Sequence, residues 1–74
     1  MTFYVTNNEA FQTVNDSISF YAAEAITLEY SVDGVNYVGV DLSTVTFPDN
    51  IVVACKEGTY FKISGITNKL LVNN

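Results

Sequence analysis

Apolar and polar residues alternate along much of this chain, and the alternation predicts β-strands. The clearest case is residues 17–22, where Ile18, Phe20 and Ala22 fall on one face and polar residues separate them. The only helix-like piece, residues 22–25, is one turn long and too short to be stable without packing. The chain therefore predicts an all-β structure.

Asp33-Gly34 lies between two alternating runs, residues 26–32 and 35–40, and is the strongest local signal in the chain. Asp-Gly in this position predicts a β-hairpin, because a type I′ turn needs positive φ at both central residues. In the two-residue register Tyr30 faces Tyr37 as a cross-strand pair. A type I turn with a G1 bulge at Gly34 would shift the pairing by one residue. We favour the two-residue register because it stacks the two tyrosines.

Shorter runs complete the set of predicted strands. Together with the runs above they give about seven or eight strands, with turn signals at intervals of about eight to twelve residues, as in small sandwiches and barrels. No linker, repeat or low-complexity segment divides residues 1–74. We therefore expect a single domain, a small antiparallel β-sandwich or barrel. The further predicted strands are residues 3–5, 10–14, 44–47, 51–55 and 69–72, and the run between Glu57-Gly58 and Gly65.

Residues 51–55 are apolar on both faces and are predicted to form a central strand. Glu57-Gly58 follows as a second tight turn. If this turn makes a hairpin, Val52 and Ala54 lie beside Phe61 and Ile63 on one core face.

The small size of the chain limits how it is stabilised. A chain of 74 residues buries only about 60% of its unfolded surface. Its single cysteine excludes an internal disulfide, and the absence of histidine leaves no closed set of zinc ligands. Charged residues make up only 15% of the chain. We therefore expect association with another protein to supply extra stability.

The net charge is −5, with three basic residues, all of them lysines. This composition excludes an ordinary nucleic-acid-binding surface, which needs basic residues to neutralise phosphates. It also excludes attraction to an anionic membrane. No signal peptide and no apolar run long enough to span a bilayer is present, so we expect a protein that is made and kept in a cytosol, or that leaves it by lysis or inside an assembly.

Candidate chemistry is sparse. Cys55 has no histidine to activate it and lies in an apolar run, so we interpret it as a core residue. The eight acidic residues are widely spaced and fall mostly in predicted turns, and the four glycines form no phosphate-binding loop. We predict no catalytic residue, no metal ligand and no cofactor, and therefore no enzyme.

The aromatic residues carry more information. Five tyrosines and five phenylalanines are many large rings for so small an interior. Tyrosine is favoured at protein interfaces because its hydroxyl tolerates water. Tyr30, Tyr37 and Tyr60 are therefore candidate protein-contact residues, while Asp33-Gly34 and Glu57-Gly58 are structural turns. The alternative interpretation is that the tyrosines cap the edges of the core.

Two stretches resemble a known kind of module. Residues 30–37, Tyr-Ser-Val-Asp-Gly-Val-Asn-Tyr, resemble the Y-S-x-D-G-x-x-(W/Y) hairpin of extracellular and phage β-sandwich modules, including discoidin-like and fibronectin-like ones. Residues 58–65, Gly-Thr-Tyr-Phe-Lys-Ile-Ser-Gly, resemble the glycine-bounded strand with adjacent aromatic and basic residues that often follows it. Tyr37 stands where such modules often have tryptophan.

A small chain of this kind, rich in asparagine and tyrosine, resembles tailed-phage virion accessory proteins. The resemblance implies a capsid decoration (auxiliary) or fibre-associated protein, present in many copies on capsid or tail subunits and localised in the virion. It implies no catalytic residue. Self-association is a further expected partner interaction. The alternative is a small acidic cytosolic binding module or inhibitor of a host enzyme.

Overall fold

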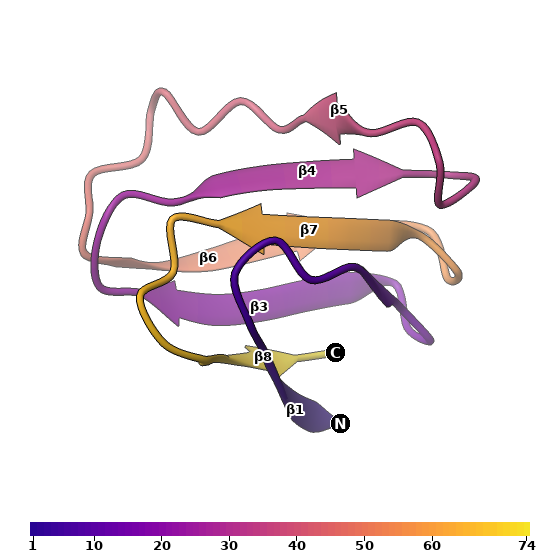
Figure 1. The fold of residues 1–74 in the computed structure, drawn as a ribbon, viewed down its shortest axis with the longest axis horizontal. Coiled ribbons are helices and arrows are strands. Elements are labelled where there is room, and N and C mark those ends of the chain that lie inside the picture. Colours follow the sequence, from indigo (N-terminus) through magenta and orange to yellow (C-terminus); the bar gives the residue numbers. More distant parts are fainter.

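The computed structural model describes residues 1–74 and contains eight short strands and no helix (Figure 1). The strands form where apolar and polar residues alternate one by one along the chain. Every strand pair is antiparallel. No helix that could cross a membrane is present. In chain order the strands are β1 (Thr2–Val5), β2 (Phe11–Gln12), β3 (Ser17–Ala22), β4 (Thr27–Ser31), β5 (Val38–Gly39), β6 (Asp49–Ala54), β7 (Tyr60–Ser64) and β8 (Leu70–Asn73).

The strands form two sheets of four. Sheet A has the order β1-β8-β3-β6, and sheet B has the order β2-β7-β4-β5. The sheets are separate and bury their inner faces against each other, which makes the fold a sandwich and not a closed barrel. The predicted fold class is thereby confirmed, with the sandwich as the correct alternative.

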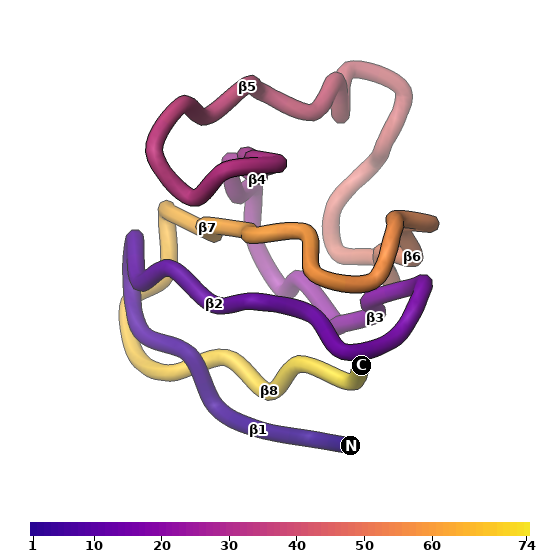
Figure 2. The backbone as a smooth tube through the Cα atoms, turned by 90° about the vertical axis from the view of Figure 1, so that its right-hand side faces the viewer, coloured from indigo at the N-terminus to yellow at the C-terminus, as the bar shows by residue number.

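The chain crosses between the sheets at almost every turn. Only β4 and β5 are consecutive strands within one sheet. In Figure 2 the connection from β5 to β6 swings from one side of the molecule to the other, and the two chain ends lie together beside β1 and β8. The amino group of Met1 donates to the carbonyl of Asn74 at 2.8 Å.

The core lies between the sheets and draws on six of the strands. Its nine buried residues are Val5, Ile18, Phe20, Ala22, Leu28, Ile51, Phe61, Ile63 and Val72. The predicted inward face of β3 is confirmed, because all three of its apolar residues belong to this set.

The prediction for β6 is wrong in two respects. β6 is an edge strand of sheet A, and it pairs with β3 and not with β7. The turn at Glu57-Gly58 does reverse the chain, but it carries the chain into the other sheet, where β7 pairs with β4. Val52 consequently points outward with 72% of its surface exposed.

The predicted strand at residues 44–47 is also absent. This part of the chain is irregular, and the N–H of Val45 donates to the carbonyl of Leu42 at 3.0 Å. Val45 and Phe47 still pack against the core. Their apolar character reflects packing rather than strand pairing.

Candidate protein-contact surface

The Asp33 carboxylate organises the loop that joins β4 and β5. Its Oδ1 accepts the N–H of Val35 at 2.8 Å, the N–H of Asn36 at 2.9 Å and the hydroxyl of Ser31 at 2.7 Å. Its Oδ2 accepts the side-chain amide of Asn36 at 3.0 Å. The bonds from the Asn36 N–H, the Val35 N–H and the two side chains hold the pKa of Asp33 well below its usual range, because they stabilise the charged carboxylate. The charge stabilises the loop and is not free to bind a ligand.

Ser31 sets where the strand ends. Its side chain is buried, and its Oγ accepts the N–H groups of Asp33 at 3.2 Å and Gly34 at 2.9 Å. A longer loop, residues 32–37, therefore replaces the expected two-residue turn. Gly34 has φ +77°, as a turn glycine should.

The favoured hairpin register is wrong by one residue. Tyr30 pairs with Val38 and not with Tyr37, because the loop holds Tyr37 outside the ladder. The two tyrosines therefore form no cross-strand pair.

The three candidate tyrosines lie in different places. Tyr37 and Tyr60 are half-buried on the outer side of sheet B. The Nζ of Lys62 lies 4.2 Å from the ring centroid of Tyr37, and a Cβ added at Gly34 would come within 3.2 Å of the Tyr60 ring. Tyr30, opposite the buried Phe61, faces the other side of the sheet. They do not form one surface, and their contact role stays a prediction.

Tyr30 lines an apolar groove of about 380 Å³ between the sheets, which also contains Cys55. The Cys55 side chain is half-buried, and its sulfur lies 3.7 Å from the carbonyl oxygen of Asn15 and 3.9 Å from Oγ1 of Thr13. Neither group is a base that could form a thiolate. Cys55 packs against the core, consistent with its interpretation as a core residue.

The second turn, Glu57-Gly58, is held by the backbone. The N–H and hydroxyl of Thr59 both donate to the carbonyl of Lys56, at 3.1 and 2.6 Å. Gly58 has φ +84° and its N–H donates to Thr13. This turn has a structural role.

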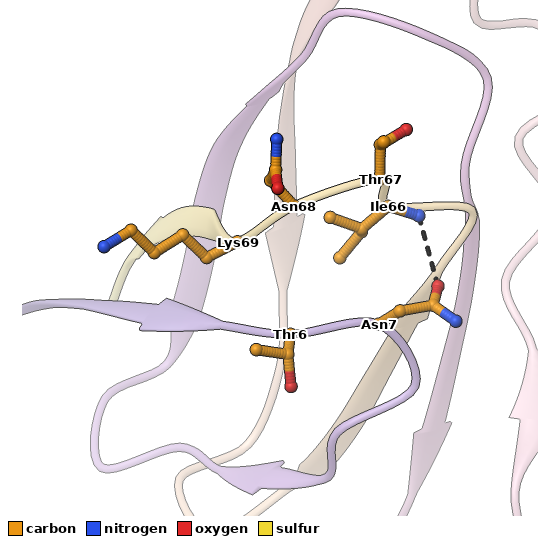
Figure 3. Close-up of a pocket in the computed structure, with 6 residues that line it drawn as sticks. All are labelled: Thr6, Asn7, Ile66, Thr67, Asn68 and Lys69. Carbon is orange, nitrogen blue, oxygen red and sulfur yellow. Dashed lines mark hydrogen bonds between the residues drawn. The ribbon is translucent and has the colours of Figure 1, made fainter.

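A polar hollow of about 640 Å³ lies where the turn after β1 meets the turn before β8 (Figure 3). Oδ1 of Asn7 accepts the N–H groups of Gly65 at 2.8 Å and Ile66 at 3.1 Å, which ties the two turns together. The side chains of Asn68 and Lys69 point away from each other in Figure 3. With no converging polar groups, the hollow offers no evident ligand site.

The outer face of sheet A is the surface that sequence reasoning missed. No side chain that its strands direct outward is charged, although the chain carries a net charge of −5. The large exposed residues among them are Tyr4 at 58%, Tyr21 at 54%, Val52 at 72% and Leu71 at 48%. We call this surface the sheet A face; its residues are Thr2, Tyr4, Ser17, Ser19, Tyr21, Asn50, Val52, Ala54, Leu71 and Asn73.

The residues of the sheet A face come from four strands far apart in the chain. The alternation in residues 17–22 does direct Tyr21 away from the core, but only the strand order brings Tyr4 and Leu71 opposite each other. No three acidic or cysteine side chains lie close enough to share a metal ion.

No protein-family model, no curated protein and no solved structure matches this chain.

Proposed function

We propose that this protein is a non-enzymatic structural protein of a phage particle, a capsid decoration or auxiliary protein that docks on the virion lattice through the sheet A face. The observation that carries the proposal is the uncharged, partly apolar character of that face on an otherwise acidic protein. Interface cores are depleted in charged residues and enriched in tyrosine.

The composition of the face favours burial against another protein. Its serine, threonine and asparagine side chains cost far less to desolvate than charged groups would. Tyr4 and Tyr21 contribute large rings whose hydroxyls can remain hydrated at the rim. A partner that covers this face would therefore gain apolar burial, and would have to accommodate the Lys69 ammonium, which lies 4.5 Å from the ring centroid of Tyr4.

The size of the face fits a repeated, multi-copy arrangement. Four strands spaced by about 4.8 Å span roughly 15–20 Å, which is small for a stable pairwise interface. A lattice that presents many equivalent sites compensates for a weak individual contact, particularly when one decoration protein bridges neighbouring subunits. Binding only to the assembled shell then stabilises the shell.

The alternative, an acidic inhibitor of a host enzyme, has less support. Several carboxylates bond to their own loops: Glu9 accepts the N–H of Thr6 at 2.8 Å, and Asp41 accepts the N–H of Ser43 at 2.9 Å. Together with Asp33, these groups are engaged within the protein and form no dense acidic surface.

Purified virions test the proposal. They should contain an 8.1 kDa protein in a fixed ratio to the major lattice subunit. The double variant Tyr4→Ser/Tyr21→Ser should be lost from particles, while Val35→Ser, which changes a more exposed residue outside the face, should be retained. Particles without the protein would refute the proposal. Recovery of one basic host enzyme in a pull-down would instead favour the inhibitor.

A further inference from the structure

The free edge of β6 is the longest unpaired strand edge in the molecule. β2 and β5 are edge strands of two residues each, while β6 has six and pairs only with β3. An exposed edge of this length is a template for another strand unless it is protected by lysine, proline, a bulge or a covering loop. Residues 49–54 contain neither lysine nor proline.

One hydrogen bond shows which residues of β6 direct their backbone N–H and C=O groups toward β3 and which direct them away. The N–H of Cys55 donates to the carbonyl of Asp16 at 2.8 Å. Because bonded pairs alternate along an antiparallel ladder, Ile51 and Val53 direct their backbone groups toward β3. The N–H and C=O groups of Asn50, Val52 and Ala54 therefore point away from sheet A. The other longer edge, β1, directs only Thr2 and Tyr4 outward by the same reasoning, because the N–H of Asn74 donates to Met1 at 2.7 Å.

The space beside this edge is open and is lined by both apolar and polar groups. A groove of about 430 Å³ runs along all of β6 and is lined on its other side by Val40, Asp41, Leu42 and Val45. The irregular segment before β6 therefore borders the edge without closing it.

We propose that two copies of this chain pair through this edge, β6 against β6, in an antiparallel ladder centred on Val52. In this register Val52 faces Val52 of the second copy, and Asn50 faces its Ala54. Every outward backbone group then finds a partner, since each of these residues donates one bond and accepts one. A shift of the centre by one residue in either direction leaves some of these groups without a partner on β6.

The charges at the two ends of β6 suit this self-pairing. Asp49 precedes the outward positions and Lys56 follows them. In this register Asp49 of one copy lies opposite Cys55 of the other, and Lys56 follows Cys55 beyond the end of β6, so its long side chain extends past the strand end toward the carboxylate at both ends of the ladder. In the single chain, Oδ1 of Asp49 accepts the N–H of Asn50 at 2.8 Å. Pairing transfers that N–H to Ala54 of the second copy and frees the carboxylate for the lysine.

The first test is a disulfide that reports the register. Directly opposed residues of a bonded pair have Cα atoms about 5.5 Å apart, within disulfide range. In a Cys55→Ser background, Val52→Cys should form a covalent dimer under mild oxidation. Val35→Cys in the same background is the control, because Val35 is 78% exposed and lies on the loop over sheet B. Equal cross-linking of both variants, or none of either, would overturn the proposal.

The second test is charge reversal with rescue. The unmodified protein should shift from 8.1 kDa toward twice that mass in analytical ultracentrifugation between about 1 μM and about 1 mM. Asp49→Lys and Lys56→Glu should each weaken dimerisation by roughly tenfold, and the double variant should restore it. Lys69→Glu makes the same charge change elsewhere and should have no effect.

A monomer throughout the concentration range would overturn the proposal, as would single variants that behave like the control or a double variant that fails to recover. The outcome is independent of docking on a virion. The sheet A variants Tyr4→Ser and Tyr21→Ser leave the β6 edge intact, and they should dimerise normally even if they no longer bind particles.

Discussion

The outer faces of the two sheets differ in whether another part of the chain lies over them. On sheet B, residues 32–37 fold over the sheet, where Ser31 is buried and Tyr60 is half-buried. Elsewhere on this face Glu29 lies opposite Lys62 on the neighbouring strand. On sheet A no loop covers the strands, and no outward side chain is charged. Residues 32–37 cover part of the outer face of sheet B, whereas the apolar side chains on the outer face of sheet A stay exposed.

The difference between the two faces explains why tyrosines that look alike in the sequence have different surroundings in the structure. Tyr37 contacts Lys62 and supports the loop, while Tyr4 is 58% exposed with Lys69 beside it, its Nζ 4.5 Å from the ring centroid. Some of the tyrosines therefore pack beside the loop of residues 32–37, which we call the cover, and others lie exposed on the sheet A face. Substitutions in the cover should reduce stability, and substitutions on the sheet A face should reduce it less.

The largest effect is expected at the cover itself, from Gly34→Val. A β-branched side chain at φ +77° is strained, and its Cβ would lie 3.2 Å from the Tyr60 ring. We expect a loss of about 2–4 kcal/mol in the free energy of unfolding, measured with urea. Gly39→Val is the matched control, because a Cβ there meets nothing within 4 Å. Equal losses would show that the loop does not depend on Gly34.

Ser31→Ala should have the next largest effect. The substitution leaves the N–H groups of Asp33 and Gly34 without their acceptor beneath the loop. A loss of about 1–3 kcal/mol is expected from urea unfolding. Ser17→Ala, at an exposed position on the sheet A face, should change stability by less than about 0.5 kcal/mol. A Ser31→Ala variant as stable as Ser17→Ala would contradict the proposed anchoring of the loop.

The pair Tyr37→Ser and Tyr4→Ser compares the two faces directly. Tyr37→Ser removes a half-buried ring and its contact with Lys62, and should cost about 1–2 kcal/mol. Tyr4→Ser should cost less than about 1 kcal/mol, since the ring is mostly exposed and the change removes only its contact with Lys69. Thermal unfolding of both variants would decide the matter, and the reverse order of stabilities would refute the distinction between the faces.

The smallest effect is expected on the pH dependence of stability, in the variant Asp33→Asn. The Asp33 pKa is lowered from 3.8 in the folded state, so its contribution to stability is present above that value and is lost as the pH falls through the lower folded pKa. The melting temperature of the Asp33→Asn variant should therefore fall less than that of the parent protein when the pH drops below about 4. Asp16→Asn, at another exposed carboxylate, should keep the parent profile. An unchanged slope in Asp33→Asn would argue against the loop bonds as the cause.

The sequence by itself determined the strands and the chain reversals. The alternation in β3 and β4 and the breaks at Gly34, Gly58 and Gly65, all with positive φ, are local properties, because side-chain direction and glycine conformation depend on a few neighbouring residues. These features were sufficient to predict an all-β fold, although residues 44–47 form no strand and the predicted strands at residues 10–14 and 35–40 shorten to Phe11–Gln12 and Val38–Gly39.

Only the tertiary structure decided which strands pair and what each face meets. The turn at Gly58 fixes a reversal but not the sheet that the chain enters next, so β6 became an edge strand although its sequence is apolar on both faces. Likewise, the bond from Ser31 to Asp33 lengthened the loop and moved Tyr37 out of the ladder. Tyr4, Tyr21, Val52 and Leu71 share a face because β1, β8, β3 and β6 are neighbours in space, a long-range fact that no local pattern contains.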